Sequence, residues 1–194
     1  MNSHTRPFEG LSVCVYMGSR SGHAPHWQQL AEAVGEGIAR RGWRLVYGGG
    51  RTGLMGACAS AALAAGGEVV GVIPDHLVER EVAHTGLTEL IRVPDMHTRK
   101  AQMAAHSDGF VTLPGGIGTF EEFFEIWTWR YLGLHRKPIG LLNHEHFFDP
   151  LLQFLDNTVE AGFLNADTRA TLISASTPNN LLDALFDQTS IFRE

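Results

Sequence analysis

The chain has 194 residues, enough for one domain with a sizeable buried core. Hydrophobic residues make up 44% of it and charged residues 19%, which is ordinary for a soluble globular protein. The formal net charge of −6 argues against a general nucleic-acid binder, because phosphate backbones require a basic surface. A local basic pocket is still compatible with that charge.

The cysteine content and the N-terminal residues indicate the cellular compartment of the protein. Cys14 and Cys58 are the only cysteines, and both lie among apolar or small residues, which is typical of buried thiols in a reducing compartment. Residues 1–10 lack the apolar segment of a secretion signal, and no apolar run approaches membrane-spanning length. We therefore expect a cytoplasmic protein that contacts no membrane, with a tail at 1–10 and a single domain at 11–194.

Apolar runs alternate with segments of helical periodicity along the whole chain. In chain order we predict a strand at 11–18, a helix at 26–42, a strand and then a glycine loop at 43–50, a helix at 53–67, strands at 68–74 and 88–95, a helix at 96–107, a strand that leads into a glycine loop at 109–116, a helix at 119–132, a strand at 137–143, a helix at 147–163, a strand at 171–176 and a helix at 178–188. The strands are solidly apolar, so both faces of their sheet should be covered. This pattern predicts a single-domain α/β fold, doubly wound and Rossmann-like, with a mainly parallel sheet and helices on both faces.

Three glycine-rich loops follow predicted strands, at 17–22, 47–56 and 113–119. In a doubly wound sheet, ligands bind outside the carboxyl ends of the strands, where these loops lie. Backbone N–H groups can approach an anion where no Cβ intervenes, and helix N-termini favour negative charge. The loops therefore predict a ligand that carries a phosphate.

The segment GGGRTG at 48–53 satisfies the pattern G-x-G-x-x-G, which is weak evidence alone. It follows the second strand instead of the first and lacks a ribose-binding acid at the expected distance, so we do not expect bound NAD or FAD. Its glycines either contact phosphate or only allow tight turns and close packing, and the sequence leaves both open. The Walker pattern is absent, which counts against ATP hydrolysis.

Two neighbouring acids follow the third glycine loop. Thr119 and Glu122 have the spacing of a capping box, in which each side chain binds a backbone N–H at a helix start. Taken alone, that spacing favours a cap over catalysis. The glycine platform and the second acid, Glu121, favour a functional role. Adjacent helical residues point about 100° apart, so the two acids are not automatically a catalytic pair.

A basic pair opens the predicted helix at 96–107. Arg99 and Lys100 lie near its start, where cations oppose the helix macrodipole. This placement suggests an anionic ligand nearby. The alternative is that both are ordinary solvated side chains.

The predicted helix at 119–132 carries more aromatic residues than one sheet face usually needs. They recur at helical spacing, at Phe120, Phe123, Phe124, Trp127 and Tyr131. Core packing is the first interpretation, and a homodimer interface along the edge of this stripe is the second. Glu121, Glu125 and Thr128 form a polar face of the same helix that is available to a pocket.

Metal and Schiff-base cofactors are not expected. His144 and His146 are two residues apart, but no zinc-binding framework accompanies them. Lys100 and Lys137 are the only lysines, and neither has a setting that suggests a Schiff base.

Six segments together resemble one known family. They read CVYMGSRSG, LVYGGGRTGLMG, GVIPDHL, MHTRKAQM, LPGGIGTFEEFFEIWTW and GLHRKPIGLLN. Their pattern resembles the LONELY GUY (LOG) family of cytokinin riboside 5′-monophosphate phosphoribohydrolases, long mislabelled as lysine decarboxylases. The resemblance covers nearly the whole chain, and its P-G-G-x-G-T-x-x-E motif with the upstream Arg-Lys pair is specific in combination.

The resemblance implies hydrolysis of the N-glycosidic bond of an N6-modified adenosine 5′-monophosphate. The products would be the free base and ribose 5-phosphate, with no redox or metal cofactor, and the protein would be at least a homodimer. The catalytic residues implied are Arg99 and Glu122. The substrate-binding residues implied are Glu81, Arg99, Lys100, Gly116, Ile117, Gly118, Thr119, Phe120, Glu121, Glu122 and Thr128.

Two other functions stay open from the sequence. One is a general purine-nucleotide nucleosidase acting mainly on AMP, because nothing in the sequence defines a pocket for the N6 group. The other is a non-catalytic nucleotide carrier, against which the pair Arg99 and Glu122 argues, because a binder can dispense with the acid. Lysine decarboxylation is the poorest alternative, since no cofactor-binding lysine is evident.

Overall fold

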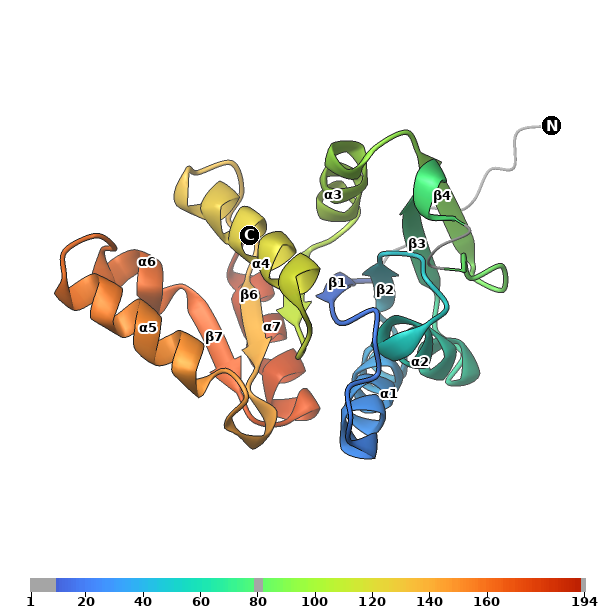
Figure 1. Ribbon diagram of the computed structural model, residues 1–194, viewed down its shortest axis with the longest axis horizontal. Coiled ribbons are helices and arrows are strands. Elements are labelled where there is room, and N and C mark those ends of the chain that lie inside the picture. Colours follow the sequence, from blue (N-terminus) through green and yellow to red (C-terminus); the bar gives the residue numbers. More distant parts are fainter. Residues whose placement is uncertain (1–9, 79–81, 193–194) are drawn as a thin grey trace.

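The computed structural model describes residues 10–78 and 82–192 (Figure 1). Its seven strands form one sheet in which every neighbouring pair is parallel, in the order β4-β3-β2-β1-β5-β6-β7. The strands are β1 (Ser12–Tyr16), β2 (Arg44–Tyr47), β3 (Val69–Pro74), β4 (Glu89–Val93), β5 (Gly109–Thr112), β6 (Ile139–Leu142) and β7 (Leu172–Ala175). The predicted α/β fold with a parallel sheet is therefore confirmed.

In the described part of the chain, helices separate successive strands except β3 and β4, between which only the 3₁₀ turn at Asp75–Leu77 is described. The helices are α1 (Pro25–Arg40), α2 (Gly53–Ala64), α3 (Met96–Ala105), α4 (Ile117–Tyr131), α5 (Asp149–Glu160), α6 (Ala166–Ala170) and α7 (Pro178–Phe192), with short 3₁₀ turns η1 (Asp75–Leu77) and η2 (His144–His146). Within the described ranges, no helix combines the length and the apolar character that crossing a membrane requires.

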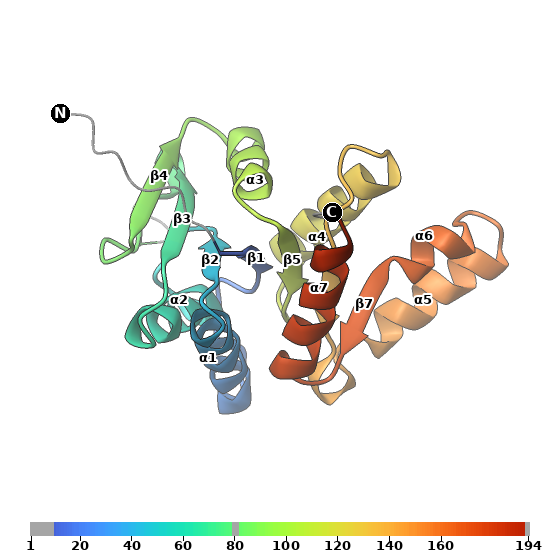
Figure 2. The same cartoon turned by 180° about the vertical axis from the view of Figure 1, so that it is seen from behind.

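The central strand β1 shows why both faces of the sheet are covered. All five of its side chains are buried, and they point alternately to opposite faces. Val13 and Val15 join a core that α1, α2 and α7 complete, whereas Cys14 and Tyr16 join a second core completed by α3, α4 and α5. Figures 1 and 2 show these two helical layers from opposite sides. Cys14 and Cys58 are both buried and unbridged, as the sequence predicts.

The order of the strands reverses between β1 and β5. From β1 the chain runs outward through β2, β3 and β4, then returns to β5 on the other side and continues to β6 and β7. The loop after β1 leads to α1 on one face, and the loop after β5 leads to α4 on the other. The two loops touch, because the Gly18 amide donates a hydrogen bond of 3.3 Å to the Pro114 carbonyl. This reversal is the place where doubly wound folds bind ligands.

The strands end where the chain enters the glycine-rich loops. β2 ends at Tyr47, directly before Gly48, in agreement with the predicted strand followed by a glycine loop. β5 ends at Thr112, before Leu113 and Pro114, which is earlier than the predicted bound at residue 116. Proline has no N–H to donate to a neighbouring strand, so the strand does not continue through Pro114. The five-residue helix α6 was not predicted, since it is too short to show a periodic pattern. The single-domain assignment of 11–194 stays a prediction.

The aromatic stripe of α4 is only partly core. Phe123 and Trp127 are buried as predicted, whereas Phe124 and Tyr131 are exposed, Tyr131 to 61%. Positions 124 and 131 lie on the same side of the helix, rotated away from the sheet. The core interpretation is therefore wrong for these two residues.

Candidate active site

The loop after β5 runs from Leu113 to Gly116, and α4 begins at Ile117. The N-terminal cap of the helix is Gly116, so Thr119 lies in the first turn and Glu122 in the second. The predicted capping box is therefore wrong, because it requires Thr119 at the cap itself. The glycine loop lets the helix start earlier than the side-chain pattern suggests. The Glu122 side chain consequently does not cap the start of the helix.

The glycines of this loop are of two kinds. A Cβ added at Gly115 would overlap with Oγ1 of Thr119 and lie 2.9 Å from the amide nitrogen of Gly18, so packing accounts for this residue. A Cβ at Gly116 or Gly118 would meet no atom of the described residues within 4 Å. Packing does not explain these two. Their amides lie at the N-terminus of α4, where an anion can approach the backbone closely.

The glycines after β2 have a structural explanation. A Cβ at Gly48 would overlap with the Arg99 guanidinium, and one at Gly53 would overlap with the Ser19 carbonyl. Gly49 and Gly53 have φ values of +77° and +61°, which favour glycine. For this loop the structure supports close packing and tight turns, the second of the two interpretations that the sequence leaves open.

Arg99 is buried and anchored to the backbone of the sheet. The Asp95 side chain caps α3 by accepting a hydrogen bond of 2.7 Å from the Thr98 amide, which lowers the pKa of Asp95. Arg99 follows in the second turn and is 4% exposed. Its Nε donates to the Val72 carbonyl at 3.1 Å and its Nη2 to the Gly48 carbonyl at 2.7 Å. The solvated alternative is therefore wrong for Arg99, and β2 and β3 fix the position of its charge.

Lys100 joins α3 to α4. Its side chain is 9% exposed, and its Nζ forms ion pairs with Glu121 and, at 3.1 Å, with Glu125. Burial opposes the lysine charge, but hydrogen bonds and charge from the two carboxylates outweigh it and raise the pKa of Lys100. Lys100 is thus not solvated either. Glu121, the acid whose role the sequence left open, is a partner of this lysine.

The charges of Glu122 and Arg99 both affect a buried side chain of the central strand β1. Burial raises the pKa of the Cys14 thiol; the Glu122 carboxylate raises it further, and Arg99 lowers it. Burial also raises the pKa of Tyr16, and the charge of Cys14 and then that of Glu122 add to this effect. Both predicted catalytic residues therefore lie within electrostatic range of one buried group on β1. Cys14 lies in the middle of β1, and Tyr16, within electrostatic range of Glu122, ends the strand at the place where the sheet order reverses.

Three further residues implied by the resemblance lie on the first turn of α4. Ile117 is exposed beside the two open glycines, Thr119 is buried beneath the loop, and Phe120 is half-buried against the core. Glu81, also implied, lies outside the described residues.

The structure does not bring Thr128 to the glycine loop. Thr128 is six residues beyond Glu122, which is about 9 Å along a helix axis. Its hydroxyl is exposed and donates a hydrogen bond of 2.7 Å to the Phe124 carbonyl. It lines a separate cavity of about 220 Å³ with Tyr131 and Phe163. In a single chain, Thr128 and the loop belong to different surfaces.

Sequence reasoning missed groups that surround Arg99 and Glu122. Tyr16 is buried at the last position of β1, within electrostatic range of Glu122, and its hydroxyl hydrogen-bonds the Cys14 thiol. A polar aromatic residue that ends an apolar strand directly before a glycine loop is a signal that could have identified it. The carbonyls of Gly48 and Val72 carry no signal in the sequence, because every residue has one.

The fold and this site define a Rossmann-like protein with a glycine-rich loop at a helix N-terminus, a buried basic pair and a carboxylate near the switch point of its sheet. Residues 55–185 match the family described as "Possible lysine decarboxylase". The cytokinin riboside 5′-monophosphate phosphoribohydrolase of Rhodococcoides fascians is 52% identical over 163 residues, which cover 84% of this chain and 82% of that protein. The chain belongs to this family, the LOG family that its motifs resemble.

Other relatives agree with this membership. The cytokinin riboside 5′-monophosphate phosphoribohydrolase LOG of Oryza sativa subsp. japonica is 46% identical over 170 residues, covering 88% of this chain and 70% of the rice protein. Among solved structures, the molybdenum cofactor carrier protein of Chlamydomonas reinhardtii aligns with a TM-score of 0.71 over 93% of this chain and 99% of that chain. Its identity of 21% shows a shared fold alone.

Proposed function

We propose that this protein hydrolyses the N-glycosidic bond of N6-modified adenosine 5′-monophosphates and releases the free base and ribose 5-phosphate. The observation that carries the proposal is the ion-pair contact between α3 and α4, which lies beside the accessible glycines Gly116 and Gly118. Lys100 makes this link, and it brings the helix of Arg99 to the helix of Glu122. The activity named for the relatives supports the same reaction class.

In the proposed reaction Glu122 positions and deprotonates a water molecule that attacks C1′ of the ribose. The bond from C1′ to N9 of the base breaks, its electron pair leaves with the base, and the base takes up a proton. The transition state has oxocarbenium character, which a nearby carboxylate stabilises. Because two backbone carbonyls anchor Arg99, its charge can hold Glu122 or the ribose phosphate in a fixed position.

The 5′-phosphate is proposed to bind at the start of α4. The amides of Gly116 and Gly118 are accessible there, and the helix N-terminus attracts negative charge. Glu121 and Glu125 raise the pKa of Lys100 but also offset its charge, so the backbone amides at the start of α4 supply the proposed phosphate contacts. No metal or redox cofactor takes part in the proposed reaction.

We also propose a homodimer that pairs the outer faces of α4. Tyr131 and Phe163 are exposed to 61% and 89%, and together with Phe124 they border the cavity that contains Thr128. Exposed aromatic residues gathered on one surface are typical of protein interfaces. Pairing of this face is one way to bring Thr128 to a substrate. Light scattering tests it: wild type should have twice the mass of the 21.3 kDa chain, and Tyr131→Glu should reduce that mass to one chain.

The proposed reaction is tested by incubating the protein with nucleoside monophosphates, nucleosides and triphosphates and separating the free bases by chromatography. We expect base release from the monophosphates and much less from the matching nucleosides, because the loop recognises the phosphate. Release of adenine from AMP at the rate of isopentenyladenine from its monophosphate would favour a general nucleosidase. Binding of AMP with no ribose 5-phosphate formed would favour a carrier and contradict the proposal.

A further inference from the structure

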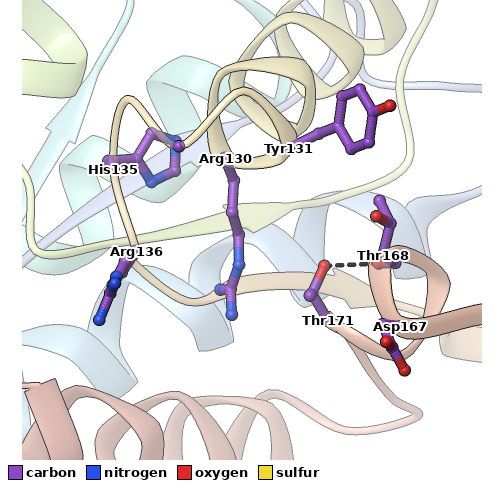
Figure 3. Close-up of a pocket in the computed structure, with 8 residues that line it drawn as sticks. Arg130, Tyr131, His135, Arg136, Asp167, Thr168 and Thr171 are labelled. Carbon is purple, nitrogen blue, oxygen red and sulfur yellow. Dashed lines mark hydrogen bonds between the residues drawn. The ribbon is translucent and has the colours of Figure 1, made fainter. Parts of the chain in front are cut away.

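A second cavity lies at the opposite end of α4 from the glycine loop. Its volume is about 420 Å³, and its walls come from the end of α4, the following loop and α6 (Figure 3). It is lined by Arg130, Tyr131, Gly133, His135, Arg136, Asp167, Thr168 and Thr171. Because α4 has 15 residues, the cavity and the glycine loop are about 20 Å apart along its axis. The cavity is thus separate from the glycine loop, and it adjoins the smaller cavity beside Thr128, with which it shares Tyr131 and Thr168.

Arg130 is half-buried in this cavity without a carboxylate partner among the described residues. Its Nη1 donates to the Lys137 carbonyl at 2.8 Å, a neutral acceptor. Burial lowers the pKa of Arg130, so the protein has desolvated this charge without neutralising it. Arg41 and Arg169 show the contrast, since each pairs with an aspartate, Asp183 and Asp156 respectively.

Further polar side chains surround this guanidinium. Arg136 lies on the exposed rim, and Figure 3 shows Arg130 between Arg136 on one side and Thr168 and Thr171 on the other. The Thr171 hydroxyl already donates to the Thr168 carbonyl and accepts from the Trp127 indole, which fixes its position. The cavity wall therefore combines two guanidinium groups with the fixed hydroxyl oxygen of Thr171.

The two remaining titratable side chains do not cancel this positive charge. His135 uses both ring nitrogens on backbone groups: Nε2 donates to the Ile126 carbonyl at 3.0 Å and Nδ1 accepts from the Lys137 amide at 3.1 Å. Burial lowers the pKa of His135, so it is neutral at neutral pH. Asp167 is an exposed acid on the rim. Two arginines facing one exposed carboxylate leave a net positive cavity.

We propose that this cavity is a second anion-binding site and takes a phosphate-bearing small molecule, with Arg130 and Arg136 as the residues that bind its phosphate. Guanidinium groups bind phosphate oxygens through paired charge-assisted hydrogen bonds. The volume lies in the range of small-molecule sites and exceeds the needs of a phosphate alone. Thr168 and Thr171 line the same cavity, and hydroxyl groups of this kind can hydrogen-bond the hydroxyls of a sugar. A sugar phosphate has this combination of groups.

The site is tested by two-dimensional ¹H–¹⁵N NMR titration of the full chain at constant ionic strength. Sodium phosphate and ribose 5-phosphate are the two probes, and the amides of Gly133, Thr168 and Thr171 report the cavity. Those of Gly116 and Gly118 report the glycine loop. We expect saturable shifts of the cavity amides with both probes. Tighter binding of ribose 5-phosphate identifies a sugar phosphate as the ligand class, and equal binding identifies inorganic phosphate.

Arg130→Gln should weaken binding at the cavity amides by roughly tenfold or more, which is the loss of one charge-assisted contact. It should leave the response of Gly116 and Gly118 unchanged. Arg40→Gln is the matched control, because it removes the same charge from an exposed pair with Glu36. If Arg130→Gln fails to fold, the exposed Arg136→Gln provides the same comparison. An absence of saturable shifts at the cavity, or equal affinity in wild type and in a folded arginine variant, overturns the proposal.

Discussion

Replacing Lys100 by methionine removes the cation that joins α3 to α4 while it keeps the length of the side chain. A pair of unit charges about 4 Å apart interacts by about 4 kcal/mol at an effective dielectric constant of 20. That gross figure must be reduced, because the side chain of Glu121 is 51% exposed and that of Glu125 is 26% exposed. Desolvation of Lys100 reduces it further. The net loss in free energy of unfolding should be about 2 kcal/mol.

For a chain of this length, a loss of about 2 kcal/mol lowers Tm by about 4–8 °C. Circular dichroism at a fixed protein concentration measures the shift, since Tm depends on concentration if the protein is an oligomer. Glu125→Gln and the double variant complete a thermodynamic cycle, from which we expect a coupling of about 1 kcal/mol between Lys100 and Glu125. Arg40→Met is the control and should lower Tm far less, because its pair with Glu36 is exposed. A Lys100→Met variant as stable as wild type, with no coupling in the cycle, would refute the reasoning.

Three further predictions follow from the same contacts. The stability that Lys100 contributes should be fully present below pH 10.5 and be lost as the pH rises through its raised native pKa. In urea unfolding, the free energies of unfolding of wild type and Lys100→Met should therefore converge above pH 10.5. Gly118→Ala should leave Tm unchanged or slightly higher, because the new methyl group meets no described atom, yet raise KM for the monophosphate; an unchanged KM would place the phosphate elsewhere. Gly48→Ala should lower kcat at least tenfold, because its Cβ would displace the Arg99 guanidinium, and wild-type kcat in a folded variant would contradict that role.

The parallel sheet could be predicted from the sequence because its strands are short and apolar on both faces. Cys14 and Val13, for example, are both buried although they point to opposite cores. The position of the glycine loops at the carboxyl ends of strands then follows from chain order alone. The start of α4 could not be predicted from side chains, because Thr119 and Glu122 imitate a capping box and the glycine that actually caps the helix leaves no such pattern.

The burial of the basic pair, Arg99 and Lys100, also could not be predicted from the sequence. Arg99 and Lys100 are adjacent in a helix start, which reads equally well as a solvated surface. Arg99 is held in its buried position by hydrogen bonds to the Val72 and Gly48 carbonyls, and Lys100 is covered by its contact with α4. Both are tertiary contacts between segments far apart in the chain. The catalytic assignment of Glu122 accordingly rests on the family motif, and the position of the helix cap at Gly116 removes the capping box as the competing explanation.

The central claim is tested most directly by measuring base release from isopentenyladenosine 5′-monophosphate with wild type and Glu122→Gln. The amide is nearly isosteric with the carboxylate, so the variant should keep the fold and the Tm of wild type. We expect wild type to release isopentenyladenine and ribose 5-phosphate in equal amounts. The variant should lose at least 10²-fold in kcat, the range that general acid–base groups contribute. Full activity of Glu122→Gln, or no base release by folded wild type, would contradict the account.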